Sequence, residues 1–275
     1  MTHPARHRAL HRIGAALSDH DQRLLRLLAS SRFATTRQLA RFLAANHTSA
    51  ASALRQTSRT LKHLHDQKFV ITLERRIGGA RAGSTGLIWA LTPLGHRLLD
   101  AVDGKPVHRR YRPEEEPFPG FLEHTLAVTE THLTLSELDT QEQIRLTRFE
   151  TEPACWRSYL GAGGMTATLK PDAKAVLAVG QYQDSYFLEI DRGTEALIVV
   201  VRKCLQYQAY RRSGLEQRTN KVFPAVLWVT HTRARADAIR ERLAAEKTIT
   251  PGLFSVVPID DLRTHIIAGP ASTEP

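Results

Sequence analysis

The chain has 275 residues, of which 42% are hydrophobic, and it carries 38 Lys and Arg against 28 Asp and Glu, a formal charge of +10. This length is typical of one large or two ordinary domains, and the apolar fraction excludes a wholly disordered chain. The longest strongly apolar run is far too short to span a bilayer, no secretory signal is visible, and there are only two cysteines, so we expect a cytoplasmic protein without a membrane segment, disulfide framework or zinc finger.

The positive charge is concentrated in the N-terminal part of the chain. Residues 1–112 contain 20 Lys and Arg and 6 Asp and Glu, a balance of +14, whereas residues 113–275 contain 18 and 22, a balance of −4. A strongly basic segment favours a polyanionic partner, and nucleic acid is the commonest one. The sequence therefore predicts that the N-terminal part binds DNA.

Changes in composition divide the chain into five segments. Residues 103–120 are rich in Pro, Gly and charge and are predicted to form a linker. Residues 18–102 before it and 121–267 after it are the two expected domains. Residues 1–17 are interpreted as a flexible basic N-terminus, and residues 268–275 as a flexible tail.

The first domain has the pattern of a winged helix-turn-helix. Leucine spacing and Ser or Thr caps predict helices beginning after Ser18, at Thr35-Thr36 and at Thr48-Ser49. Extended segments at 69–73 and 87–91 flank a glycine-rich turn, and Thr92-Pro93 begins a further helix. Three helices, a hairpin and a closing helix are the elements of this fold, whose third helix enters the major groove.

Polar and basic side chains on the third helix and near the hairpin are the predicted DNA contacts. The third helix buries its apolar stripe and leaves the opposite side for base edges and phosphates, with further arginines near the tip of the hairpin. These residues are Ser52, Arg55, Gln56, Arg59 and Lys62 on the helix, and Arg75, Arg76 and Arg81 in the hairpin.

The second domain is predicted to be a layered α/β domain. Its expected elements, in chain order, are a helix at 121–138, strands at 168–179 and 186–191, a helix at 194–212, a strand at 223–229, a helix at 233–246 and a strand at 253–258. Helices alternating with strands favour a mixed sheet covered by helices.

Three carboxylates stand on the two expected neighbouring strands. Glu189 and Asp191 share a sheet face because side chains alternate along a strand, and Asp172 reaches that face if the strands pair. Carboxylates converging at strand ends hold a hard divalent cation, Mg²⁺ or Mn²⁺, with Asp172 and Glu189 as the expected ligands. Such an ion can polarise a phosphodiester and lower the pKa of bound water.

This order resembles the PD-(D/E)xK nuclease superfamily, in which Pro-Asp is followed by acid-x-Lys on the next strand. Pro171-Asp172 and Glu189 match the first two elements, but Asp191 stands where lysine is expected. Lys203 on the following helix or Lys174 on the Asp172 strand can supply the charge. Asp191 is expected to assist in the catalytic set. Further candidates are Gln206 and Tyr210, which form a Gln-x-x-x-Tyr spacing on one helix face, and Glu123 or Glu130 on the first helix.

Over residues 18–260 the chain is similar to the replication-relaxation family of bacterial plasmids and integrative conjugative elements. The resemblance rests on the runs that begin at Asp21, Arg32, Trp89, His124, Lys170, Phe187 and Phe223, and on Lys203, Tyr207 and Tyr210. The most specific run is Glu-Ile-Asp-Arg-Gly-Thr-Glu, residues 189–195. The resemblance implies a role in plasmid replication, DNA relaxation or transfer, with replication or conjugation proteins as partners.

Two functions remain open on the sequence. One is a DNA-binding protein whose C-terminal domain is a Mg²⁺-dependent endonuclease or nickase. The other is a non-catalytic initiator, accessory factor or repressor whose C-terminal domain serves homodimerisation or partner docking; this hypothesis predicts that Arg192 neutralises the acids. A relaxase using Tyr207 or Tyr210 is disfavoured because the sequence lacks a clustered histidine triad.

Overall fold

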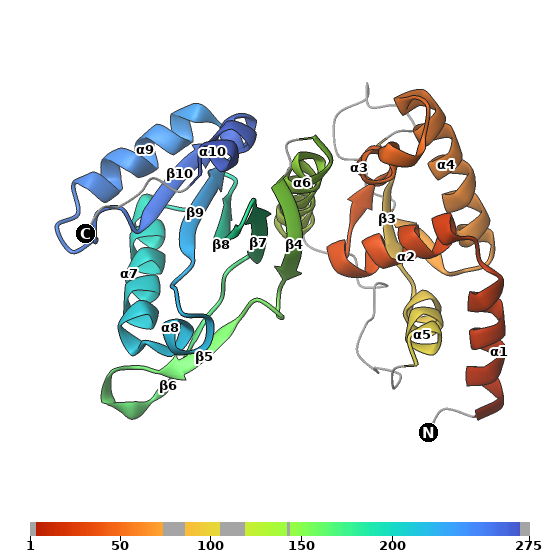
Figure 1. Ribbon diagram of the computed structural model, residues 1–275, viewed down its shortest axis with the longest axis horizontal. Helices are drawn as coiled ribbons and strands as arrows, with labels where there is room; N and C mark the ends of the chain where they lie inside the picture. Colours follow the sequence, from red (N-terminus) through yellow and green to blue (C-terminus); the bar gives the residue numbers. More distant parts are fainter. Residues whose placement is uncertain (1–3, 74–85, 105–118, 142–143, 270–275) are drawn as a thin grey trace. The chain divides into compact units, whose positions relative to one another are not determined.

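The computed structural model describes residues 4–73, 86–104, 119–141 and 144–269 (Figure 1). The chain forms two compact units, Met1–Leu133 (unit 1) and Thr134–Pro275 (unit 2). The division between them lies inside the long helix α6, Pro119–Gln141. Unit 1 combines helices with a small antiparallel sheet and unit 2 combines helices with a mixed sheet, so the expected mixture of α and β structure is confirmed.

Unit 1 places a three-stranded antiparallel sheet among helices. Its elements before α6 are α1 (Pro4–Ala16), α2 (Asp19–Ser31), β1 (Ala34–Thr35), α3 (Thr36–Phe42), η1 (Ala44–Asn46), α4 (Ala50–Asp66), β2 (Val70–Leu73), β3 (Ile88–Leu91) and α5 (Pro93–Val102). The strand order is β1-β3-β2. The side chains of Ser18, Thr35, Ser49 and Thr92 accept backbone N–H groups at the starts of α2, α3, α4 and α5, which satisfies donors that a helix start leaves free.

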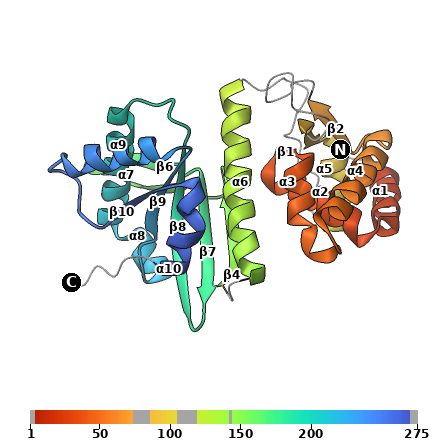
Figure 2. The ribbon, with the colours of Figure 1, turned by 90° about the horizontal axis from the view of Figure 1, so that it is seen from above.

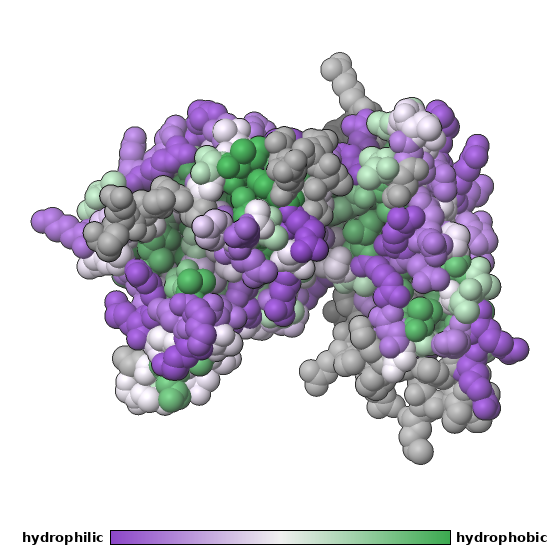
Figure 3. Space-filling model, viewed as in Figure 1, coloured by the Kyte–Doolittle hydropathy of each residue, from purple (hydrophilic) through white to green (hydrophobic). Residues whose placement is uncertain are grey.

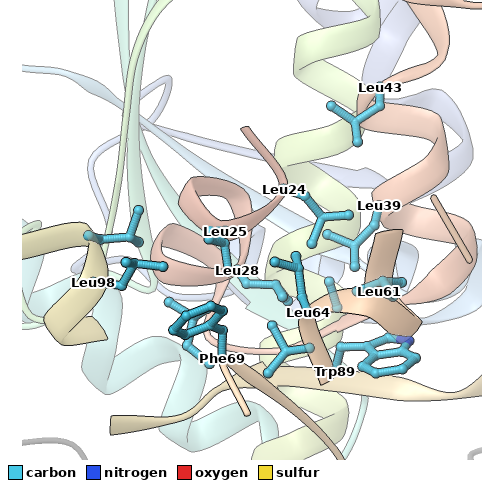
Figure 4. Close-up of a cluster of buried hydrophobic side chains, with 14 residues drawn as sticks. Leu24, Leu25, Leu28, Leu39, Leu43, Leu61, Leu64, Phe69, Trp89 and Leu98 are labelled. Carbon is cyan, nitrogen blue, oxygen red and sulfur yellow. The ribbon is translucent and has the colours of Figure 1, made fainter. Parts of the chain in front are cut away.

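Leucines from three helices form the main core of unit 1. Figure 4 shows Leu24, Leu25 and Leu28 of α2 facing the leucines of α3 and α4. Phe69 and Trp89 close this cluster from the sheet side. Because α2, α3 and α4 all bury an apolar stripe here, the opposite side of α4 is left for solvent.

The start of α5 is fixed by a close approach to the residues that directly precede β2. The Thr92 hydroxyl donates to Lys68 O at 2.7 Å and accepts the N–H of Gly95 at 3.0 Å. A Cβ at Gly95 would lie 2.2 Å from Phe69 O, so only glycine fits this position. The Thr-Pro-Leu-Gly sequence therefore lets the backbone of the first turn of α5 pack directly against the backbone at Phe69.

Unit 1 extends beyond the residues that the sequence analysis assigned to its domain. Residues 4–16, expected to be flexible, form α1, and a Cβ at Gly14 would lie 2.2 Å from Val102 of α5. The first half of α6, expected in the second domain, packs on Phe33 through Leu122 and Leu126. The apolar side chains of these two helices were visible in the sequence, but their partners are distant in the chain.

Unit 2 contains a five-stranded sheet of order β10-β9-β8-β7-β4. After α6, its elements are β4 (Ile144–Thr151), β5 (Arg157–Leu160), η3 (Ala162–Gly164), β6 (Thr166–Leu169), β7 (Ala173–Val179), β8 (Tyr182–Asp191), α7 (Leu197–Ser213), α8 (Leu215–Asn220), β9 (Ala225–Thr230), α9 (Arg233–Ala244), β10 (Phe254–Pro258), η4 (Ile259–Asp261) and α10 (Leu262–Ala268). Strands β4, β7 and β8 are antiparallel neighbours, whereas β8, β9 and β10 run parallel.

Helices α7 and α9 cover one side of this sheet (Figure 2). Their buried residues, among them Tyr207 and Ile239, share a core with Phe187, Val226 and Trp228 of the strands. The parallel step from β8 to β9 requires a crossover, and α7 with α8 provides it. Helix α7 therefore crosses directly over the strand that carries Glu189 and Asp191.

The segment expected as one strand at 168–179 is divided into two. Residues up to Leu169 pair with β5 in a separate two-stranded sheet, and β7 begins at Ala173. Pro171 has no N–H to donate to a ladder, so the strand is interrupted there. Strands β4 and β5 and helices α8 and α10 were not predicted, because their short or irregular apolar patterns gave no clear period.

Candidate functional site

Asp172 lies at the break between β6 and β7 and is held against β8. Its Oδ2 accepts the N–H of Ile190 at 2.6 Å, and its own N–H donates to Leu188 O at 3.1 Å. Because Ala173 pairs with Leu188, one further step along the ladder places Asp172 opposite Glu189. The pairing that the sequence analysis required for the two acids to meet is present.

Glu189 is only 4% exposed and makes contact with two residues of α7. The Tyr207 hydroxyl donates to its Oε1 at 2.5 Å, and Lys203 Nζ lies 3.3 Å from its Oε2. Lys203 Nζ also donates to Lys170 O at 2.7 Å, in the segment just before Asp172. The geometry brings together three residues predicted from the sequence, and we call Asp172, Glu189, Lys203 and Tyr207 the acid–lysine cluster.

The acid–lysine cluster shifts the pKa values of its members. Burial, followed by the charge of Asp172, raises the pKa of Glu189 to about 8 against the opposing effects of Lys203 and Tyr207. Burial lowers the pKa of Lys203, but the charges of Glu189 and Asp172 raise it more, so its pKa lies above the ordinary value. Burial and the charge of Glu189 raise the pKa of Tyr207 well above the ordinary value, which keeps its hydroxyl protonated.

Asp191 has a different environment from Glu189, although both point to the same side of β8. Its two oxygens accept from Nε and a terminal nitrogen of Arg235 at 2.8 Å each, and Oδ1 also accepts the N–H of Gly193 at 2.6 Å. Arg235 further donates to Glu195 O at 2.7 Å. This bidentate pair joins the end of β8 to the first turn of α9, an arrangement typical of a structural ion pair.

Tyr210 and Lys174 belong to a second buried network centred on Glu216 of α8. Lys174 Nζ and the Tyr210 hydroxyl each contact a Glu216 oxygen at 2.6 Å, and Arg157 Nε lies 3.5 Å from Oε2. Burial raises the pKa of Glu216, but its bonds to Lys174 and Tyr210 lower it more, so the net shift is downward. Of the two lysines considered from the sequence, Lys203 and not Lys174 contacts Glu189.

The structure separates the other predicted members from the acid–lysine cluster. Gln206 is exposed on α7. The carboxylate of Glu130 lies 2.6 Å from an Arg41 nitrogen and accepts from Gln38 at 3.0 Å within unit 1. The only chemical role considered for Tyr207 from the sequence was that of a nucleophile. Its side chain is buried, and its hydroxyl donates a hydrogen bond to Glu189. Its spacing of four residues from Lys203 places both on one helix face and was a signal for the correct partner.

The donor set suits a hard divalent cation with water and substrate in its remaining positions. Within the described ranges no group of three or more His, Cys, Asp or Glu side chains is arranged to hold a metal. Mg²⁺ is commonly bound through one or two carboxylates together with waters and substrate phosphates, so the Asp172 and Glu189 pair fits it without a third protein ligand. Burial first, and then the neighbouring charge of Asp172, raise the pKa of Glu189, and a cation bound between the two carboxylates would oppose both effects.

The exposed side of α4 carries the residues predicted to contact DNA. Arg55, Gln56, Arg59 and Lys62 are exposed and Ser52 is half-buried, whereas the opposite side of the helix is buried. No hydrogen bond or ion pair of these four long side chains is found within the described part of the chain. They are free to reach a partner. The other predicted contacts, Arg75, Arg76 and Arg81, lie outside the described residues.

The profile of the replication-relaxation family matches residues 25–226, which includes α4 and the whole acid–lysine cluster. The chain belongs to the replication-relaxation family. Membership suggests a protein related to plasmid replication. In this family member, α1 and Arg235 lie outside the matched range. Comparisons with curated proteins and with solved structures gave no match. Among the described residues, no helix has both the length and the apolar character needed to cross a bilayer.

Proposed function

We propose that this protein binds DNA of its plasmid or conjugative element through unit 1 and nicks it with the acid–lysine cluster of unit 2. The order α2-β1-α3-α4-β2-β3-α5, with the sheet order β1-β3-β2, supports a winged helix-turn-helix in unit 1. In that fold α4 is the helix that enters the major groove. Its exposed cations and the N-terminal charge support DNA as the ligand.

The topology of unit 2 supports a nuclease-like core of the PD-(D/E)xK kind. The antiparallel set β4-β7-β8 is followed by α7 and the parallel strand β9, with Asp172 before β7 and Glu189 in β8. The observation that carries the proposal is the position of Lys203, whose Nζ lies 3.3 Å from Glu189 Oε2. In the acid-x-Lys pattern the lysine follows the acid by two residues, and here that position holds Asp191. Lys203 of α7 supplies the positive charge beside Glu189 instead.

Each member of the cluster has a role in this proposal. A bound Mg²⁺ or Mn²⁺ would polarise the scissile phosphate and lower the pKa of its bound water. Asp172, oriented by the N–H of Ile190, and Glu189, oriented by the Tyr207 hydroxyl, would hold it. Lys203 carries its proton at neutral pH and would stabilise the negative charge that develops on the phosphate oxygens.

A plasmid nicking assay tests this proposal. Supercoiled plasmid carrying the element's own origin region is incubated with Mg²⁺ or Mn²⁺, and open circles are counted for wild type, Asp172→Ala, Glu189→Gln and Lys203→Met. The matched control is Lys247→Met, which changes an exposed lysine of the same unit. We expect metal-dependent nicking that both acid variants lose and that Lys203→Met slows by about 10²–10³-fold, with the control unchanged. Equal nicking by all variants would exclude this cluster as the active centre.

A non-catalytic DNA-binding protein is the second candidate, and one observation favours it. Glu189 already has Lys203 and Tyr207 as partners, and Asp191 has Arg235. Acids satisfied in this way can serve structure alone. Under this reading the wild-type protein binds the origin DNA and leaves it supercoiled under every metal condition, and unit 2 serves dimerisation or docking of replication or conjugation proteins.

A further inference from the structure

The β5–β6 hairpin of unit 2 stands apart from the main sheet. Arg157–Leu160 pair with Thr166–Leu169 in a two-stranded sheet of their own, and the ribbon extends beyond the rest of the unit (Figure 1). At its tip, a Cβ on Gly163 or Gly164 would meet nothing within 4 Å. The tip of the hairpin is therefore open to solvent at these two positions.

The tip of this hairpin exposes two large apolar side chains. Leu160 is 71% exposed and Met165 is 76% exposed. The lower left of the surface in Figure 3, where the hairpin lies, shows green apolar atoms among pale ones. Neither residue belongs to a core cluster of its unit. Large exposed apolar side chains at the end of a projecting element indicate a contact surface.

The surroundings of the hairpin are basic. No Asp or Glu occurs between residues 157 and 171, whereas Arg211, Arg212, Arg218 and Lys221 are exposed at α7 and α8. Between residues 211 and 221 the one acid is Glu216, which is buried and paired with Lys174. An open groove of about 500 Å³ separates the hairpin from α8, and it is lined by Ser158, Tyr159, Leu160, Thr166, Ser213, Leu215 and Arg218. Hydroxyls and a guanidinium are donors that suit phosphate oxygens.

The hairpin is also connected directly to the acid–lysine cluster. Strand β6 continues through Lys170 and Pro171 to Asp172, and Lys203 donates to Lys170 O. From Met165 to Asp172 the chain spans at most about 25 Å. This reach corresponds to about seven base pairs at 3.4 Å each. A duplex held at Asp172 thus passes within reach of the hairpin.

We propose that the β5–β6 hairpin and its groove form a second DNA contact, which holds the duplex beside the acid–lysine cluster. Arg218 and the groove hydroxyls contact the sugar–phosphate backbone, and Met165 and Leu160 enter the minor groove as apolar wedges. A negatively charged protein partner would use the cations but has no need of the apolar tip. This contact rests on the proposed function of the cluster, and it adds where on unit 2 the DNA lies.

Salt-dependent binding of the full chain tests this contact. Fluorescence anisotropy with a labelled duplex from the origin region, in a chelator without divalent ions, gives the dissociation constant and its salt slope. We expect Arg218→Ala to reduce the magnitude of the slope by about 0.9, and Met165→Ser to weaken binding about tenfold without changing the slope. The matched controls are Arg145→Ala on β4 and Tyr182→Ser, whose side chain is 79% exposed at the other hairpin of the unit. Neither control should change binding.

The outcomes separate this inference from the proposed nicking activity. Wild-type affinity and slope in both hairpin variants would overturn the hairpin contact, even if the plasmid is nicked through Asp172. Changes of equal size in the controls would overturn it as well, because they would show a general charge effect. A reduced slope for Arg218→Ala in a protein that nicks nothing would support the contact and leave the nicking proposal refuted. A wild-type chain that does not bind the duplex would overturn both.

Discussion

Replacing Glu189 by glutamine removes a buried acid that weakens the folded protein at neutral pH. The folded protein keeps a proton on Glu189 up to about pH 8, whereas an ordinary glutamate has a pKa of 4.5. Between these values the unfolded chain gives up this proton and the folded protein does not. The stability of the wild type therefore falls as the pH rises from 4.5 to about 8. Glutamine at this position has no proton to release, so the stability of the variant does not decrease for this reason as the pH rises.

The size of the effect follows from the two pKa values of Glu189. Each pH unit above the unfolded pKa costs about 1.4 kcal/mol while the folded protein remains protonated. This gives a cost of about 3 kcal/mol at pH 7 and about 1 kcal/mol at pH 5. The loss of the Tyr207 and Lys203 contacts alters both values alike. The stability of Glu189→Gln relative to wild type is therefore expected to rise by about 2 kcal/mol between pH 5 and pH 7.

Urea denaturation of metal-free protein at the two pH values measures this difference. Trp156 and Trp228 report on unit 2 by fluorescence. Glu241→Gln, which changes an exposed acid of α9, is the matched control and should show the same effect at both pH values. A relative stability of Glu189→Gln that stays constant, or that falls towards pH 7, would refute the assignment of a buried, protonated Glu189. Added Mg²⁺ should stabilise the wild type and leave Glu189→Gln unchanged, because ligand binding to the folded state adds stability.

Three further expectations concern structure and DNA contact. Arg235→Met leaves the buried carboxylate of Asp191 without its partner and should lower the free energy of unfolding by about 3 kcal/mol in urea titrations, whereas adding Asp191→Asn to it should recover part of that loss. Gly95→Ala forces a Cβ against Phe69 O and should cost about 2 kcal/mol by the same method; a neutral result would contradict the close approach. Arg59→Ala should weaken binding of origin DNA and reduce the magnitude of its salt slope by about 0.9 in anisotropy titrations. Unchanged affinity and slope would show that this side of α4 does not contact the DNA.

Local patterns predicted much of unit 1. Caps at Ser18 and Thr35 and the apolar spacing of leucines gave the helix starts and the core, because a helix repeats its environment within a few residues. What the sequence could not give were the partners of α1 and α6. Gly14 against Val102 and Leu122 against Phe33 are contacts between residues about 90 positions apart, and no local period encodes them.

The acid–lysine cluster was predictable in part for the same reason. Alternation along β8 put Glu189 and Asp191 on one side, and strand order brought Asp172 beside them. The sequence did not show that Glu189 and Asp191 have different partners. Arg235, which pairs with Asp191, lies 44 residues farther along the chain. Tyr210 was expected at the site, but its hydroxyl binds Glu216 instead. Glu216 lies on α8, a helix too short to be predicted from its sequence pattern.

The packing of α6 decides where the DNA-binding part of this chain can be cut. Fragments ending near residue 104, which the composition suggests, would leave Phe33 and Ile88 facing water where Leu122 and Leu126 now cover them. They would also remove Glu130, which binds Arg41 and Gln38 on α3. Expression of residues 4–133 keeps these contacts and the close fit of α1 on α5. The shorter piece would carry the exposed arginines of α4 on an incomplete core, and failure of that piece to bind DNA would reflect lost stability rather than a lost interface.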